Sequence, residues 1–190
     1  EMSVVAGSGD DIIGTQDALD ADTGGTFSLY SFDGGDGFDT FEIDATDAVD
    51  SETNLAAASL EVTDSVINFE ALSLTGFGGD VVDATTWGLA DNVTLADGYT
   101  SAGSLTVNNG ATVTVAEGAN TDISLIVDGA GDAGSDDDSL TVNLESEDGE
   151  DYSDVTIADV ETVNVVSTET DTNDTADTND TSIEPTGADN

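Results

Sequence analysis

The sequence predicts an all-β protein of short stacked strands, as in a parallel β-helix or β-roll. Between about residues 26 and 166, short segments alternate apolar residues with Thr, Ser or Asn, the pattern of half-buried strands. Turns rich in Gly, Asp and Asn separate these segments. Residues 66–74 and 157–165 also share one pattern, in which an apolar residue precedes a glutamate and an apolar–polar–apolar strand. Such repetition indicates stacked coils, and a β-sandwich is the alternative architecture.

The expected strands follow one another at short intervals along the chain. They cover residues 26–32, 71–74, 93–95, 104–107, 111–115, 123–127, 139–144 and 162–166. Helical turns are expected only within 47–58 and 83–89. From about residue 167 the sequence turns to Thr, Asp and Asn without an apolar face, which is typical of a linker or tail. We therefore expect a β-domain over residues 1–166 and a linker or tail over residues 167–190.

The charge balance indicates a need for cations from solution. The chain carries 43 acidic residues and no Lys, Arg or His, so its formal net charge is −43. Self-repulsion of this size opposes a compact state, and Ca²⁺ is the expected counter-ion because it binds oxygen ligands in flexible geometry. The absence of Cys and His excludes disulfides and zinc sites of the usual kind. We also expect no nucleic-acid binding and no membrane insertion, since the charge is repulsive and no apolar run is long enough.

The same amino-acid composition argues against an enzyme. The sequence offers no histidine or lysine base for a serine nucleophile, and no thiol. Paired carboxylates could still support glycoside hydrolysis, which usually also requires aromatic platforms. The single tryptophan, Trp87, is expected in the core or as a cap at the end of a coil rather than as a sugar platform.

The clearest local motif covers residues 34–42 and matches the nonapeptide G-G-x-G-x-D-x-U-x at every specified position. Its glycines permit a tight turn with inward carbonyl oxygens, and its aspartate supplies a carboxylate. Residues 7–13 repeat the pattern without the first glycine of the pair. An ordinary acidic turn is the alternative interpretation. The candidate calcium ligands are Gly7, Gly9, Asp11, Gly34, Asp36, Gly37 and Asp39.

These two turns, together with the Asn-Phe-Glu-Ala-Leu-Ser-Leu segment at 68–74, resemble the repeat region of RTX-type bacterial surface-layer proteins and related extracellular matrix or filament proteins. The resemblance implies calcium-dependent folding after export, commonly by type I secretion, and self-assembly at the cell surface. The chain departs from that pattern in having few RTX copies.

The expected function is that of a secreted, extracellular or cell-surface structural protein that self-assembles into a surface layer or filament. An RTX-like module of a large adhesin, acting as a spacer or ligand-binding domain, is the alternative. The expected partners are other copies of the chain and calcium ions, with surface polysaccharide as a further candidate. Three N-x-T sequons, at Asn92, Asn173 and Asn179, are candidate glycosylation sites, and unmodified asparagine is the alternative there.

Overall fold

The computed structural model describes residues 2–20, 30–116, 122–131, 137–146, 155–169 and 183–186. It is rich in β-strands arranged in parallel sheets with little helix, which confirms the predicted predominance of strands. The strands are β1 (Met2–Val5), β2 (Ile12–Gly14), β3 (Tyr30–Asp33), β4 (Thr40–Asp44), β5 (Val66–Ile67), β6 (Ala71–Thr75), β7 (Val81–Asp83), β8 (Asn92–Leu95), β9 (Gly103–Val107), β10 (Thr112–Val115), β11 (Ile123–Val127), β12 (Ser139–Ser146), β13 (Val155–Ala158), β14 (Thr162–Glu169) and β15 (Ile183–Thr186). The helical elements are α1 (Ala45–Ala57) and two 3₁₀ turns, η1 (Val62–Asp64) and η2 (Ala84–Trp87).

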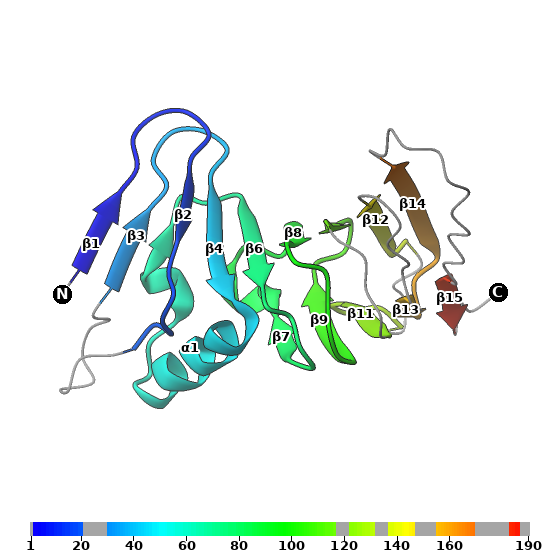
Figure 1. Cartoon of the computed structure of the whole chain (residues 1–190). Coiled ribbons are helices and arrows are strands. Elements are labelled where there is room, and N and C mark those ends of the chain that lie inside the picture. Colours follow the sequence, from blue (N-terminus) through cyan, green and yellow to red (C-terminus); the bar gives the residue numbers. More distant parts are fainter. Residues whose placement is uncertain are drawn as a thin grey trace.

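The chain alternates between sheets from one strand to the next. Even-numbered strands form one seven-stranded sheet in the order β14-β12-β10-β8-β6-β4-β2. Odd-numbered strands form two sheets, β1-β3-β5 and β15-β13-β11-β9-β7. Every pairing between the described strands is parallel and joins strands two positions apart along the chain. Successive strand pairs therefore follow one another along the long dimension of the molecule, from β1 to β15 (Figure 1). We call each odd-numbered strand, together with the even-numbered strand that follows it and their turns, a coil.

The sheet register aligns apolar side chains into a column through the core. In the even-numbered sheet, one aligned residue comes from each strand, in the order Ile13, Phe41, Leu72, Val93, Val113, Val142 and Val165. We call this set the core column. Its five inner members are at most 2% exposed, whereas Ile13 is only partly buried and Val165 is 42% exposed. The core column is therefore covered within the described stack and open at both ends.

Helix α1 follows β4 and lies beside the sheets rather than within them (Figure 1). Asp44 is its N-cap and accepts a hydrogen bond from the amide of Thr46 at 2.9 Å, as favoured for a helix start. The helix buries Ala48 and Leu55, and its buried Ser51 accepts a 2.7 Å hydrogen bond from the amide of Leu19. The sequence predicted only a helical turn here, because the alanine-rich buried face is short and polar residues interrupt it.

Aromatic residues fill the core beside α1. The Phe41 ring packs against Phe32, Phe69 and Trp87, with ring centroids 5.1, 5.4 and 5.8 Å apart. Trp87 is 1% exposed and lies in the core, one of the two places predicted for it. Farther along the stack the core column consists of valine instead. The core beside α1 is therefore filled by aromatic side chains, and the core column farther along by valine.

Most predicted strands coincide with observed ones, notably 71–74 with β6, 104–107 with β9 and 123–127 with β11. Of the segment predicted at 26–32, the structure describes only the end, within β3. The boundary at residue 166 remains a prediction, although β14 continues to Glu169 and β15 pairs with β13 inside the segment predicted as linker or tail. No helix in the described part of the chain is long and apolar enough to cross a membrane.

Candidate calcium-binding turns and acidic corner column

The two glycine-rich turns lie directly on each other in the first two coils. The turn between β1 and β2 and the turn between β3 and β4 project together from one edge of the stack (Figure 1). The amide of Asp36 donates to the Gly7 carbonyl at 3.0 Å, and the amide of Gly9 donates to the Asp36 carbonyl at 2.8 Å. The register therefore places Gly7 opposite Gly35, as the alignment of the two motif copies predicts.

Close stacking explains why the second turn is built from glycine. A Cβ atom on Gly35 would overlap the Gly7 carbonyl oxygen, and Gly35 has a φ of +95°. A Cβ atom on Gly34 would overlap the Asn68 carbonyl oxygen and lie 2.9 Å from Asp39 Oδ2. In contrast, no described atom lies within 4 Å of the position where Gly7 would carry a Cβ. The glycines of residues 34–37 are thus required by packing between coils, whatever they bind.

Asp39 is the most deeply buried candidate ligand. Its side chain is 0% exposed, and its Oδ1 accepts a 2.8 Å hydrogen bond from the amide of Asp11 in the preceding coil. Its own amide donates to Glu70 Oε2 in the following coil, also at 2.8 Å. Within the part of the chain that the structure describes, Asp39 Oδ2 is buried and receives no hydrogen bond. Such an oxygen is costly to bury unless a proton donor or a cation satisfies it.

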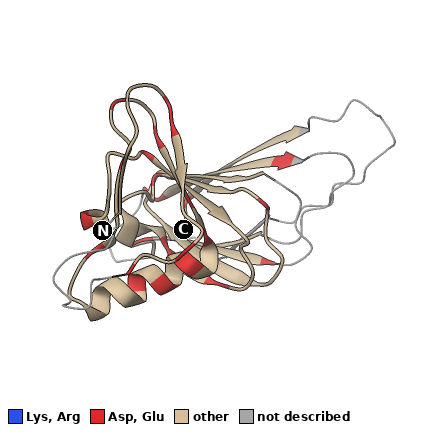
Figure 2. Cartoon of the chain, turned by 60° about the vertical axis from the view of Figure 1, so that its left-hand side comes forward, with Lys and Arg blue, Asp and Glu red and all other residues tan. Residues whose placement is uncertain are grey.

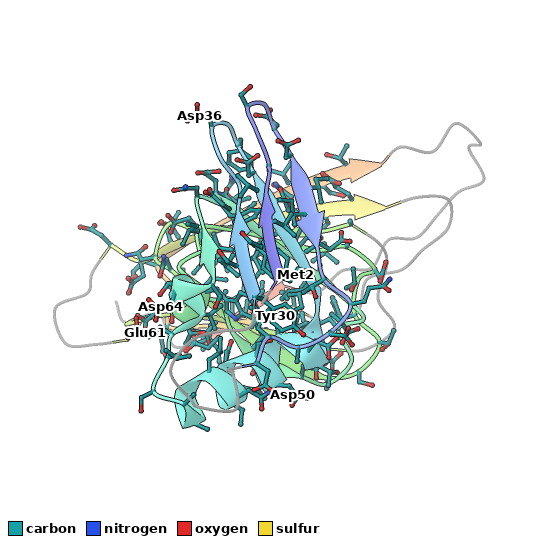
Figure 3. The ribbon with its side chains drawn as sticks, turned by 90° about the vertical axis from the view of Figure 1, so that its left-hand side faces the viewer. Met2, Tyr30, Asp36, Asp50, Glu61 and Asp64 are labelled. Atoms are coloured by element: carbon teal, nitrogen blue, oxygen red, sulfur yellow. The ribbon has the colours of Figure 1, made fainter. Side chains whose placement is uncertain are left out.

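The other two predicted carboxylate ligands are more open. Asp11 is partly buried, and its Oδ2 lies 3.5 Å from the amide of Gly7, at the limit of a hydrogen bond. Asp36 is exposed, and Figure 3 shows it at the tip of the projecting turn, pointing away from the body of the molecule. Asp11 and Asp39 therefore belong to the base of the turns and Asp36 to their tip.

An acidic residue directly precedes every even-numbered strand except β10, and we call this set the corner column. Its members are Asp11, Asp39, Glu70, Asp91, Asp138 and Glu161. Side-chain hydrogen bonds connect neighbouring coils along it, including Asn108 Nδ2 to Asp91 Oδ1 at 2.8 Å. The column was not predicted from the sequence, in which an acid directly precedes the predicted strands 71–74, 139–144 and 162–166 but not 93–95 or 111–115.

One arrangement occurs twice in the corner column. Asp138, 3% exposed, repeats one contact of Asp39, because its amide donates to Glu161 Oε2 at 2.9 Å. Its Oδ1 also accepts a hydrogen bond from the preceding coil, here from the side-chain Nδ2 of Asn109 at 2.8 Å. In the segments 66–74 and 157–165, Asn68 and Asp159 occupy aligned positions and have φ angles of +56° and +58°. The repeated pattern in the sequence therefore corresponds to a repeated corner.

The oxygen atoms at the base of the turns are of the kind that calcium prefers. Around Gly34 lie the Asn68 carbonyl oxygen and Asp39 Oδ2, and Asp33 Oδ1 accepts from the amide of Gly35 at 3.1 Å. A cation there would satisfy the buried Oδ2. Within the described ranges, however, no three acidic side chains are grouped as a metal cage requires. Any ion bound at the turns would therefore rely on carbonyl oxygens and water as well as carboxylates.

One predicted glycosylation site is engaged in the corner. Asn92 is partly buried, and its Nδ2 donates to the Glu70 carbonyl at 3.2 Å, a contact that an attached glycan would disturb. Asn173 and Asn179 lie outside the described residues. Glycosylation remains a prediction at all three positions.

Acidic residues also crowd the opposite end of the even-numbered strands. A cleft of about 480 Å³ there is lined by carboxylates of Glu42, Asp44, Asp47 and Asp97. Partial desolvation, together with the charges of Asp44, Asp17 and Asp50, raises the pKa of Asp47. Figure 2 shows acidic residues spread over α1 and the turns, with no basic residue near them. The described chain therefore leaves this charge to be screened by ions from solution.

Glu52 on α1 is the second carboxyl with a displaced pKa. Burial raises its pKa above the usual 4.5, and Asp83 adds to the increase, whereas hydrogen bonds from Trp87 and Thr86 lower it in part. The indole Nε1 of Trp87 donates to Glu52 Oε1 at 2.8 Å. The half-buried carboxylate is therefore held in place at an electrostatic cost.

Replacing Glu52 with glutamine is expected to raise the midpoint of thermal unfolding at neutral pH. The pKa of Glu52 is higher in the folded state, so the folded state binds the proton more tightly than the unfolded state does. This difference stabilises the fold below the unfolded pKa, and the stabilisation is lost as pH rises through the folded pKa. Glutamine keeps an oxygen for the indole and removes the charge. The gain should therefore be present at about pH 7 and nearly absent at about pH 3. An equal gain at both pH values, measured by circular dichroism, would contradict the assigned cause.

Comparison with known proteins found no matching family model, curated protein or solved structure.

Proposed function

We propose that this chain is a secreted, calcium-dependent structural protein that self-assembles end to end into a surface layer or extracellular filament. The proposal includes the finer fold, in which the alternating parallel strands wind as a parallel β-helix or β-roll. The regular alternation of strands between sheets and the in-register core column support it. Such a stack can be extended by adding further coils at its ends.

The single observation that carries the proposal is the core column open at both ends. Val165 is 42% exposed, although its neighbour Val142 is fully covered by the next coil. At the other end, Ile13 is partly buried, and the adjacent Ile12 is 72% exposed. The two ends present different surfaces, so contact between them is heterologous and continues from copy to copy. Open strand edges at β1, β2 and β14 would add backbone hydrogen bonds.

Calcium would allow chains of the same charge to approach each other. With a net charge of −43 and no basic side chain, two copies repel unless cations gather between them. Calcium at the glycine-rich turns would involve Asp39, with Asp11 and carbonyl oxygens of the turns, and would neutralise charge at the end that a second copy approaches. Extracellular modules typically bind calcium at about 10⁻⁴–10⁻³ M, which suits a protein that assembles after export.

The second candidate is an RTX-like module of a large adhesin, acting as a spacer or ligand-binding domain. The same axial stack favours it, because a row of coils makes an elongated unit. The two candidates differ in what covers the open ends. A structural assembly uses other copies, whereas an adhesin uses adjoining parts of one long chain.

Replacing Gly7 with alanine separates assembly from folding. The variant should fold, since no described atom lies within 4 Å of the added Cβ. In the proposed assembly, the next copy covers Gly7 in the way that the first coil covers Gly35. Gly35 has no room for a Cβ under that coil, so an alanine at position 7 should block assembly. Light scattering and electron microscopy of both proteins, in calcium and in chelator, test this. We expect filaments or sheets only from the wild type in calcium, and magnesium serves as the control ion.

Three results would count against the proposal. A wild-type chain that stays monomeric in calcium would exclude self-assembly and favour the adhesin module. Assembly that is equal in chelator and in calcium would exclude calcium dependence. Normal assembly of the Gly7→Ala variant would exclude contact through the first coil.

A further inference from the structure

A pocket beside the C-terminal end of α1 lies apart from the turns and the corner column. Its volume is about 440 Å³, within the usual range of about 300–1,000 Å³ for small-molecule sites. Helix α1 contributes Glu52 and Ala56, the connection to η1 contributes Leu60 and Glu61, and η2 contributes threonines. Figure 3 shows Glu61 next to Asp64, the last residue of η1, and apart from Asp50 on α1.

The lining combines negative charge with an apolar wall. Glu52 and Glu61 supply carboxylates, and the nearby end of α1 adds the partial negative charge of its last carbonyl groups. Ala56 and Leu60 supply hydrocarbon surface, and Thr85 and Thr86 also line the pocket, with hydroxyl groups that donate to Asp83 at 2.6 and 2.8 Å. A bare metal ion would use the carboxylates but not the apolar wall, and a neutral ligand would leave the charge uncompensated.

We propose that this pocket binds a primary ammonium group carried on a short aliphatic stem. The ammonium pairs with Glu52 and Glu61, and the stem covers Ala56 and Leu60. This sequence has no lysine, arginine or histidine, so none of its side chains can supply the cation. The charge of a cation at Glu52 would also offset the cost of desolvating its carboxylate. The inference is independent of calcium binding and of assembly.

Trp87 provides a direct readout of binding. It is the only tryptophan in the chain, and its indole N–H donates to Glu52 Oε1 at 2.8 Å. The full chain is titrated with n-pentylammonium at constant ionic strength, and the indole N–H resonance and fluorescence of Trp87 are followed. Ammonium chloride supplies the charge without the stem, and 1-pentanol supplies the stem without the charge. We expect saturable shifts with n-pentylammonium and much weaker ones with either control.

Two matched variants separate the pocket from the general negative field. Glu52→Gln keeps an acceptor for the indole and should weaken n-pentylammonium binding about tenfold. Asp50→Asn removes the same charge from the same helix at an exposed position outside the pocket lining, and should change affinity less than about twofold. Equal weakening in both variants, or equal responses to n-pentylammonium and ammonium chloride, would show only non-specific cation attraction and overturn the proposal. An equal response to 1-pentanol would reduce the site to an apolar pocket and also overturn it.

Discussion

Replacing Gly35 with alanine should destabilise the fold by about 3 kcal/mol or more, combining overpacking with a backbone conformation unfavourable to alanine. The added Cβ would overlap the carbonyl oxygen of Gly7 and lie 3.2 Å from its carbonyl carbon. Both belong to the backbone, which cannot rotate away as a side chain can. The φ of +95° at Gly35 adds strain for any L-residue. Chemical unfolding followed by circular dichroism measures the loss.

Gly7→Ala is the matched control, because Gly7 is opposite Gly35 in the motif and in the structure. Its added Cβ would meet no described atom within 4 Å, so its stability should stay within about 0.5 kcal/mol of the wild type. Equal losses in the two variants would contradict the described stacking of the turns. Both stabilities are compared in chelator, where calcium cannot compensate for a strained turn.

The sequence was informative where a local pattern determines the structure. Alternation of apolar and polar residues located strands such as β9 and β11, because each has one face in the core and one in solvent. Short strands such as β5 and β7 were missed, since two or three residues do not establish a period. Helix α1 was underestimated because Asp44, its N-cap, was not identified as a helix start.

The register between coils could not be predicted, because coils differ in length. The aligned residues Ile13 and Phe41 are 28 positions apart, whereas Val93 and Val113 are 20 apart. No fixed period therefore relates one corner to the next, and the corner column was not recognised. The alignment of the two glycine-rich turns was predictable, since their glycines mark the same positions in both copies. The burial of Asp39 depends on Glu70 and Gly34 from other parts of the fold, so its special position became visible only in the structure.

Replacing Asp39 with asparagine should have opposite effects with and without calcium. In chelator the variant should be at least as stable as the wild type, because it removes a charge from a side chain that is 0% exposed and keeps an oxygen for the Asp11 amide. In calcium the wild type should gain about 2.7 kcal/mol at a concentration one hundred times the dissociation constant, and the variant should gain little. The order of stabilities then reverses.

Asp138→Asn is the matched control for this reversal. Asp138 has the same buried place in the corner column and the same contact with a following glutamate, but its turn does not match the nonapeptide. We expect this variant to keep the full calcium response of the wild type. If Asp39→Asn also keeps it, Asp39 is not a ligand and the assignment of calcium to the glycine-rich turns is wrong. If both variants lose it, calcium acts through the corner column as a whole, because its buried carboxylates occur in both places.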